Sequence, residues 1–251
     1  ADDPTEAVKG ADVVVTALFD ADADAAVMAT ALPAMAPGAV WVQSSTVGAV
    51  GTARLAALAD EHGVAFVDAP VLGTRKPALA GMLVVLAAAP AELRPLVKPV
   101  LDAIGTRTVW VAEEPGAASR LKLVTNAWIA ILTAGVGQSI ALAQAWGIDP
   151  QLFLDAIDGG QPDSPYAHIK GAAMLSGDFD PQFELAGLRK DLALIAADAR
   201  TAGVPTDLVD VLAQAYKAAA GATATPRDIA AVVDAFRPGR SEWPEEPAPA
   251  S

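Results

Sequence analysis

The first half of the chain alternates short apolar runs with longer segments of helical character. The apolar runs predict strands at residues 13–18, 39–42, 65–68, 82–88 and 108–111. The segments between them predict helices at residues 21–35, 52–62 and 92–104. The run at 13–18 is almost uninterrupted, which is typical of a strand buried on both faces. This rhythm predicts an α/β domain with a parallel sheet and right-handed crossovers.

The rhythm stops near residue 116, and the rest of the chain predicts helices only. Residues 117–146 predict one long helix, and further helical segments follow at 150–158, 166–175, 185–202, 207–220 and 227–236. Residues 237–251 are rich in Pro and Glu, which favours a disordered tail. The sequence therefore predicts an α/β domain over residues 1–115, an all-helical domain over 116–236 and a disordered tail.

Composition restricts the chemistry and the partners. The 251 residues include no Cys and only two His, so thiolate chemistry is excluded and no metal site is expected. The net charge of -13 disfavours nucleic acid as a partner. No uninterrupted apolar run reaches the roughly 18 residues of a membrane span, and the N-terminus lacks a signal-peptide pattern. We expect a cytoplasmic protein that acts on a small molecule.

Residues 68–74 are the first segment with candidate chemistry. Asp68 ends a predicted strand, and Gly73 and Thr74 lie in the turn that follows. Open α/β sheets bind ligands at the carboxyl ends of their strands, and backbone N–H groups in such a turn can hold a carboxylate. From composition alone, an ordinary tight turn is still the better interpretation.

The second segment is the start of the long helix. Lys122 and Asn126 are four residues apart, so they lie on one helix face among many apolar neighbours. Lys122 is therefore either solvated at the helix edge or partly desolvated. Desolvation would lower its pKa toward neutrality, which suits proton transfer. This segment alone does not decide between the two states of Lys122.

The third segment with candidate chemistry is residues 188–192. Taken by itself, Lys190 in this segment indicates a solvated charged face.

Together and in this order, these segments resemble the β-hydroxyacid dehydrogenase family, which includes 3-hydroxyisobutyrate dehydrogenases and glyoxylate/succinic semialdehyde reductases. Residues 68–81 resemble its substrate motif D-A-P-V-S-G-G…G, and residues 116–126 resemble its catalytic motif G-x-G-x-x-x-K-x-x-x-N. Residues 190–192 resemble its K-D-L segment, and 11–20 and 44–47 resemble its cofactor-side strand and Ser-Thr turn. The resemblance covers nearly all of residues 1–236 and implies NAD or NADP as cofactor.

The resemblance also implies roles for single residues. Lys122 would be the general acid/base, with Asn126 orienting the substrate. Leu72, Gly73 and Thr74 would bind the substrate with Asn126, whereas Leu18, Phe19, Thr46 and Lys190 would line the cofactor site. A homodimer through the helical domain is expected from the resemblance and from the apolar stretch 127–140.

Several departures from the family pattern leave alternatives open. Leu72 replaces the family Ser, Thr74 its second Gly, Ala118 a catalytic-motif Gly, and Phe19 the usual Pro. A more apolar pocket keeps an imine reductase-like activity as an alternative, although Lys122 favours C=O/CH–OH chemistry.

The sequence contains no G-x-G-x-x-G loop, so the Rossmann-type domain is expected to be partial. A strand at 13–18 would then expose an apolar sheet edge. A truncated reading frame or a removed segment is a better explanation than a natural fragment. A non-catalytic dimerisation module is the remaining alternative, and the choice between NAD and NADP stays open.

Overall fold

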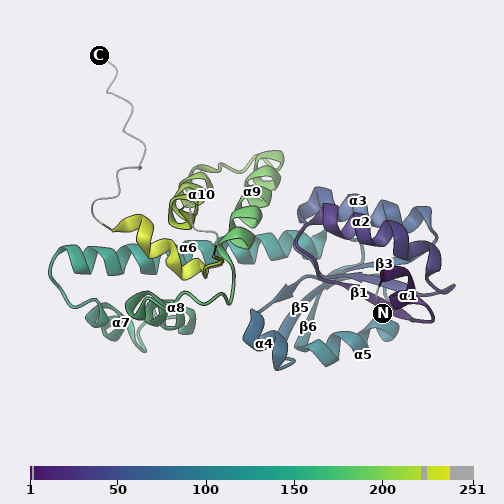
Figure 1. Ribbon diagram of the computed structural model, residues 1–251, viewed down its shortest axis with the longest axis horizontal. Coiled ribbons are helices and arrows are strands. Elements are labelled where there is room, and N and C mark those ends of the chain that lie inside the picture. The colour runs from purple at the N-terminus through teal and green to yellow at the C-terminus, as the bar shows by residue number, and fades with distance from the viewer. Residues whose placement is uncertain (2, 222–224, 238–251) are drawn as a thin grey trace, which may run out of the picture. The chain divides into compact units, whose positions relative to one another are not determined.

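The computed structural model describes residues 1, 3–221 and 225–237 (Figure 1). All of the tail predicted to be disordered lies outside the described residues, except Arg237. Contacts divide the chain into two compact units. The α/β unit comprises Ala1–Ala127 and Lys190–Pro205, and the helical unit comprises Trp128–Arg189 and Thr206–Ser251. The start of the long helix and the segment after Lys190 thus group with the sheet.

The α/β unit contains a six-stranded sheet. Its strands are β1 (Val13–Thr16), β2 (Val40–Gln43), β3 (Ala65–Asp68), β4 (Val71–Leu72), β5 (Leu83–Ala88) and β6 (Gly105–Ala112). The strand order is β1-β2-β3-β5-β4, and β6 also pairs with β5. β1, β2 and β3 are parallel, as are β5 and β6. The predicted Rossmann-type α/β fold is confirmed.

The sheet is mixed rather than wholly parallel, because β5 runs antiparallel to β3 and β4. A parallel return needs a crossover that usually carries a helix across the sheet face. Between β3 and β5 the chain forms only β4 and the five-residue helix α4 (Arg75–Leu79). The chain therefore reverses direction at this point, next to the predicted substrate turn.

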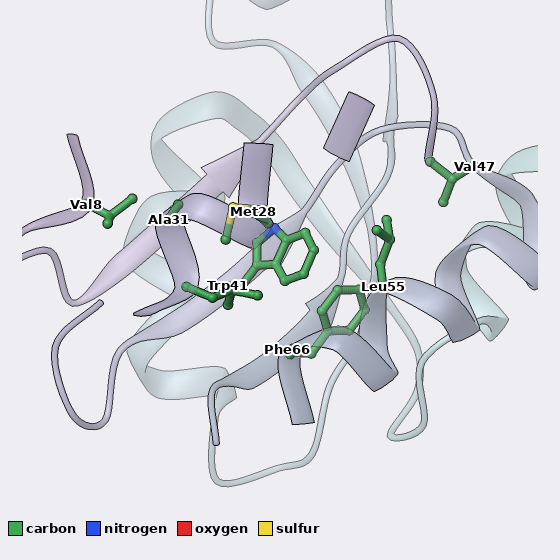
Figure 2. Packing of buried hydrophobic residues seen from close by; sticks show 9 residues of the cluster. Val8, Met28, Ala31, Trp41, Val47, Leu55 and Phe66 are labelled. Atoms are coloured by element: carbon green, nitrogen blue, oxygen red, sulfur yellow. The ribbon is translucent and has the colours of Figure 1, made fainter. Parts of the chain in front are cut away.

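Helices cover both faces of the sheet (Figure 1). They are α1 (Pro4–Val8), α2 (Ala21–Ala31), η1 (Leu32–Ala34), α3 (Gly48–Glu61) and α5 (Arg94–Ile104). Side chains alternate along β2, so that Trp41 packs with Met28, Leu55 and Phe66 beneath α2 and α3 (Figure 2). The adjacent Val40 and Val42 pack with Val97 and Leu101 of α5 on the other face. β2 is therefore buried on both sides.

β1 is an edge strand, because among the described residues it pairs with β2 alone. Val15 is 42% exposed, which confirms the expected apolar edge but contradicts burial of this strand on both faces. β1 ends at Thr16, two residues before the predicted end. Its hydroxyl accepts a 3.0 Å hydrogen bond from the indole of Trp41, which ties the edge to the core.

The remaining elements are helical, as predicted. They are α6 (Ala117–Ala145), α7 (Gln151–Ile157), α8 (Pro165–Ser176), α9 (Leu185–Thr201), α10 (Asp207–Ala220) and the 3-10 helix η2 (Ile229–Phe236). A buried ion pair of 2.7 Å between Lys170 and Asp228 ties α8 to the start of η2.

α6 alone among the described residues is long and apolar enough to cross a membrane, but 50% of its most apolar window is buried in the protein. Burial of this kind also occurs in the core helix of a globular domain.

Candidate active site

Asp68, the last residue of β3, anchors the beginning of α6. Its Oδ2 accepts the backbone N–H groups of Gly116 at 2.8 Å and Ser119 at 3.0 Å, and its Oδ1 accepts the Ser119 hydroxyl at 2.7 Å. The first N–H groups of a helix lack acceptors within the helix, and this buried carboxylate supplies the acceptor atoms for two N–H groups at the start of α6. Burial raises the pKa of Asp68, and these hydrogen bonds from Ser119 and Gly116 oppose the rise. The arrangement fixes α6 to the end of a sheet strand.

Lys122 lies on α6 just after this anchor and is only 9% exposed. Burial lowers its pKa from 10.5 to about 8, against the charge of Asp191, which raises it, and with the charge of Lys190, which lowers it. Of the two alternatives open at the sequence level, the structure therefore supports the desolvated lysine. Both protonation states are accessible near neutral pH, as an acid/base group requires.

Asn126, one turn further along α6, is completely buried. Its Nδ2 donates a 2.6 Å hydrogen bond to Oδ2 of Asp191. An ionised carboxylate only accepts, so this bond fixes which way the amide points. Asn126 Oδ1 has no hydrogen-bond partner in the part of the chain that the structure describes. A buried acceptor left unsatisfied is costly, so this atom is suited to a ligand that brings a donor.

Asp191 and Lys190 on α9 complete this cluster. Lys190 Nζ pairs with Asp191 Oδ1 at 2.8 Å, donates to the backbone carbonyl of Thr46, and lies 5.6 Å from the centre of the Phe19 ring. The solvated charged face favoured for residues 188–192 is therefore wrong for these two residues. Asp191 was not predicted as a site residue. The available signal was its position three residues after Leu188, an apolar residue that is fully buried, on the same side of the helix.

The turn after β2 lies against the same face of α9. Asp198, eight residues after Lys190, accepts the N–H of Ala49 at 3.0 Å and so caps α3 from another helix. Gly48 has φ +70, and a Cβ there would lie 3.2 Å from Leu194, which lies between Lys190 and Asp198 on this face. α9 therefore holds the 46–49 turn at two points.

Leu18, Phe19 and Thr46, three of the predicted cofactor residues, lie at or next to this turn. Leu18 and Phe19 follow β1 and are 38% and 55% exposed, and the Leu18 N–H donates to Ser45 Oγ at 2.7 Å. Ser44 Oγ is buried without a partner among the described residues. Exposed apolar side chains and an unpaired hydroxyl at the carboxyl ends of parallel strands fit the nicotinamide end of NAD or NADP.

The predicted substrate turn is only partly joined to this cluster. Leu72 packs on the apolar cluster of Leu86, Ala88 and Ala118, together with Leu121. Gly73 has φ +124, a backbone conformation that favours glycine, and a Cβ there would also lie 2.7 Å from Leu83 Cδ2. In the described part of the chain, no hydrogen bond joins residues 72–74 to Lys122 or Asn126. Their connection to the site is through packing on the first turns of α6.

Comparisons with known proteins agree with this arrangement. Residues 1–112 match the family described as the NAD binding domain of 6-phosphogluconate dehydrogenase. Residues 116–236 match the family described as NAD-binding of NADP-dependent 3-hydroxyisobutyrate dehydrogenase. A crystal structure of 3-hydroxyisobutyrate dehydrogenase from Salmonella typhimurium superposes with a TM-score of 0.85 at 25% identity, over 93% of this chain and 82% of that one.

Two curated relatives are much longer than this chain. Glyoxylate/succinic semialdehyde reductase 2 of Arabidopsis thaliana, a chloroplastic protein, is 28% identical over 204 residues, 81% of this chain and 57% of that protein. The human cytokine-like nuclear factor N-PAC is 30% identical over 236 residues, 93% of this chain and 42% of that protein. The chain thus spans about half the length of the curated relatives it matches.

Proposed function

The chain belongs to the β-hydroxyacid dehydrogenase family, and from that premise we propose that it carries the catalytic side chains of an NAD(P)-dependent oxidoreductase. The reaction interconverts a hydroxy compound, either a hydroxy acid or an alcohol, with its carbonyl. One observation carries the proposal. Lys122 is buried with a pKa of about 8, and its neighbours Asn126 and Asp191 are hydrogen-bonded to each other.

Lys122 is the general acid/base of the proposed reaction. NAD or NADP, when bound, exchanges a hydride with the substrate carbon. During reduction, the Lys122 ammonium donates a proton to the carbonyl oxygen as that oxygen gains negative charge. During oxidation, the neutral amine accepts the proton of the hydroxyl. Because the pKa is about 8, Lys122 can serve both directions at pH values close to neutral.

Asn126 and the 72–74 turn orient the substrate. Asp191 occupies the amide nitrogen of Asn126, so the free Oδ1 accepts a hydrogen bond from a hydroxyl or amine donor on the substrate. Leu72 adds an apolar contact where a hydroxyl would otherwise favour a small carboxylate. This combination supports a substrate with both a hydrogen-bond donor and an apolar portion.

Four residues hold the nicotinamide end of the cofactor. Leu18 and Phe19 supply an exposed apolar surface. Thr46 lies in the turn after β2, and its backbone carbonyl accepts a hydrogen bond from Lys190. Lys190 spans from the Thr46 carbonyl to Asp191, so it joins the cofactor side to the acid/base cluster.

A lysine substitution tests the proposed function. Lys122→Met in the full-length protein is expected to reduce kcat by about 100-fold or more, because the proton transfer is lost. Binding of the reduced cofactor, followed by nicotinamide fluorescence, should remain. Lys98→Met is the matched control, since Lys98 is an exposed lysine on α5 paired with Asp102. Retained turnover in Lys122→Met would refute the assignment.

The same assays separate the alternatives. Short semialdehydes and cyclic imines are compared side by side, and preferential turnover of imines would favour C=N reduction, for which Leu72 is the supporting feature. If the chain binds no reduced cofactor and turns over neither class, it is a non-catalytic dimerisation module.

We also propose that the helical unit forms a homodimer. α6 exposes Trp128 and Leu142, and the exposed Trp146 directly follows its last residue. These residues are 14 and four positions apart, so they lie on one side of the helix. An apolar groove along this face is lined by residues of α6, α10 and the end of η2, including Ile131, Gly135, Leu208, Val211 and Phe236. Exposed apolar surface of this extent is typical of a protein interface, and a second copy of the chain offers a matching surface.

A further inference from the structure

The turn between α7 and α8 brings three metal-ligating side chains together in the helical unit. Asp158 follows the last residue of α7, Asp163 directly precedes the cap of α8, and His168 lies in the first turn of α8. His168 Nε2 is 2.7 Å from Asp163 Oδ1 and 3.8 Å from Asp158 Oδ1. One ligand atom from each residue lies within 4.8 Å of the other two. None of these residues belongs to the proposed active site.

Among the described residues, the two carboxylates lie against one imidazole and form no ion pair with a lysine or an arginine. The N–H of Gly159 donates to Asp163 Oδ2 at 3.0 Å, which lowers the pKa of Asp163 and leaves Oδ1 turned toward His168. The site therefore presents two negative charges and a nitrogen donor to one point.

We propose that this turn binds a divalent first-row transition-metal ion through His168 Nε2 and the carboxylates of Asp158 and Asp163. Imidazole nitrogen and carboxylate oxygen together suit ions such as Zn²⁺, Co²⁺ and Mn²⁺. Around tetrahedral zinc, with bonds of about 2.0–2.1 Å, ligand atoms lie about 3.3 Å apart. The observed 2.7 and 3.8 Å lie on either side of that value, and all three ligand atoms lie within 4.8 Å of one another, so side-chain rotation can bring them to one ion.

The ion would replace the 2.7 Å contact between His168 Nε2 and Asp163 Oδ1. Partial exposure of all three side chains leaves its remaining coordination positions to water. The sequence predicts no metal site, because imidazole-based sites usually need two or three histidines. One histidine with two carboxylates avoids that requirement. The ion would clip the end of α7 to the start of α8.

Metal titration of the full chain, prepared without a polyhistidine tag, tests this proposal. Zn²⁺ binding is measured by calorimetry, and Co²⁺ is added separately so that its visible absorption reports coordination. The chain contains no Cys and only one other histidine, which keeps the background low. We expect one ion per chain, and a higher Tm in Zn²⁺ because the ion binds the folded state.

His168→Gln removes a direct ligand and is expected to weaken binding by at least about tenfold, since loss of even an outer-shell partner costs about 10–100-fold. It should also abolish the rise in Tm. His62→Gln is the matched control, because His62 lies on α3 with its Nδ1 against the Leu58 carbonyl, and it should bind as the wild type does. Equal binding by both variants would show an adventitious ion only, and no binding by the wild type would show that there is no site. Either outcome overturns the proposal. If His168→Gln does not fold, Asp158→Asn decides. Its side chain is 76% exposed, so weaker binding supports the site and unchanged binding overturns it. None of these outcomes depends on the oxidoreductase activity.

Discussion

Lys122 lies in the field of two opposite charges, so single substitutions can move its pKa in either direction. Asp191 raises this pKa and Lys190 lowers it. Asp191→Asn should therefore lower the pKa of Lys122 below about 8, and Lys190→Met should raise it. In carbonyl reduction Lys122 must be protonated, so the alkaline limb of kcat/KM should move to lower pH in the first variant and to higher pH in the second.

The opposite signs serve as the control for this pair. A merely structural disturbance would reduce kcat/KM in both variants without moving the limb in opposite directions. If both profiles shift the same way, the assignment of Lys122 as the titrating group is wrong.

Burial of Lys122 also makes folding stability depend on pH. The folded-state pKa is about 8 and the ordinary value is 10.5, so the folded state binds fewer protons between these values. The free energy of unfolding should therefore rise from pH 8 to about 10.5, by roughly 3 kcal/mol for this group. Lys122→Met should lack that increment. Urea unfolding of both proteins at pH 7 and pH 10 measures it, and an identical pH dependence would contradict the burial of a charged lysine.

At the scale of elements, the position of α6 depends on Asp68. Asp68→Ala leaves the N–H groups of Gly116 and Ser119 without an acceptor and should lower the free energy of unfolding by roughly 2–4 kcal/mol. Asp68→Asn keeps one acceptor oxygen and should lose less. The two variants are compared by urea denaturation. Similar losses in both would mean that one neutral acceptor oxygen does not hold the start of α6, and would contradict the smaller loss expected for Asp68→Asn.

The positions of the longer elements could be predicted from the sequence, because periodicity and composition are local, whereas the short β4 and α4 were not predicted. Their pairing and exact limits could not. β5 runs antiparallel because of how the 69–82 segment folds back, which the apolar pattern of 82–88 does not encode. α3 begins at Gly48, four residues before its predicted start, because Asp198 caps it from 149 residues away.

The candidate site shows the same division. Spacing placed Lys122 and Asn126 on one helix face, and the structure keeps them there. The hydrogen bond of Asp191 joins it to Asn126, 65 residues earlier, and Lys190 contacts Thr46, 144 residues earlier. A local charge pattern cannot distinguish such residues from a solvated face.

At the scale of the whole molecule, the proposed dimer has a direct test. Leu142→Glu with Val211→Glu places charges on the exposed face formed by α6 and α10, and should convert a dimer to a monomer in light scattering at micromolar concentration. Leu79→Glu, an exposed apolar residue on α4 of the other unit, is the matched control and should leave the dimer intact. A wild-type protein that is monomeric under these conditions would contradict the proposal.

The contact between Lys190 and Thr46 has a thermodynamic consequence. Lys190 contributes to the electric field at Lys122 and is held by the turn that faces the proposed nicotinamide site. A nucleotide that repositions this turn must therefore change the proton affinity of Lys122. Because such linkage is reciprocal, protonation of Lys122 must change the affinity for the nucleotide by the same factor. If the nucleotide repositions the turn, the hydrogen bond from Lys190 to the Thr46 carbonyl makes proton uptake and nucleotide binding heterotropically coupled. The Kd of the nucleotide is then expected to vary with pH around 8.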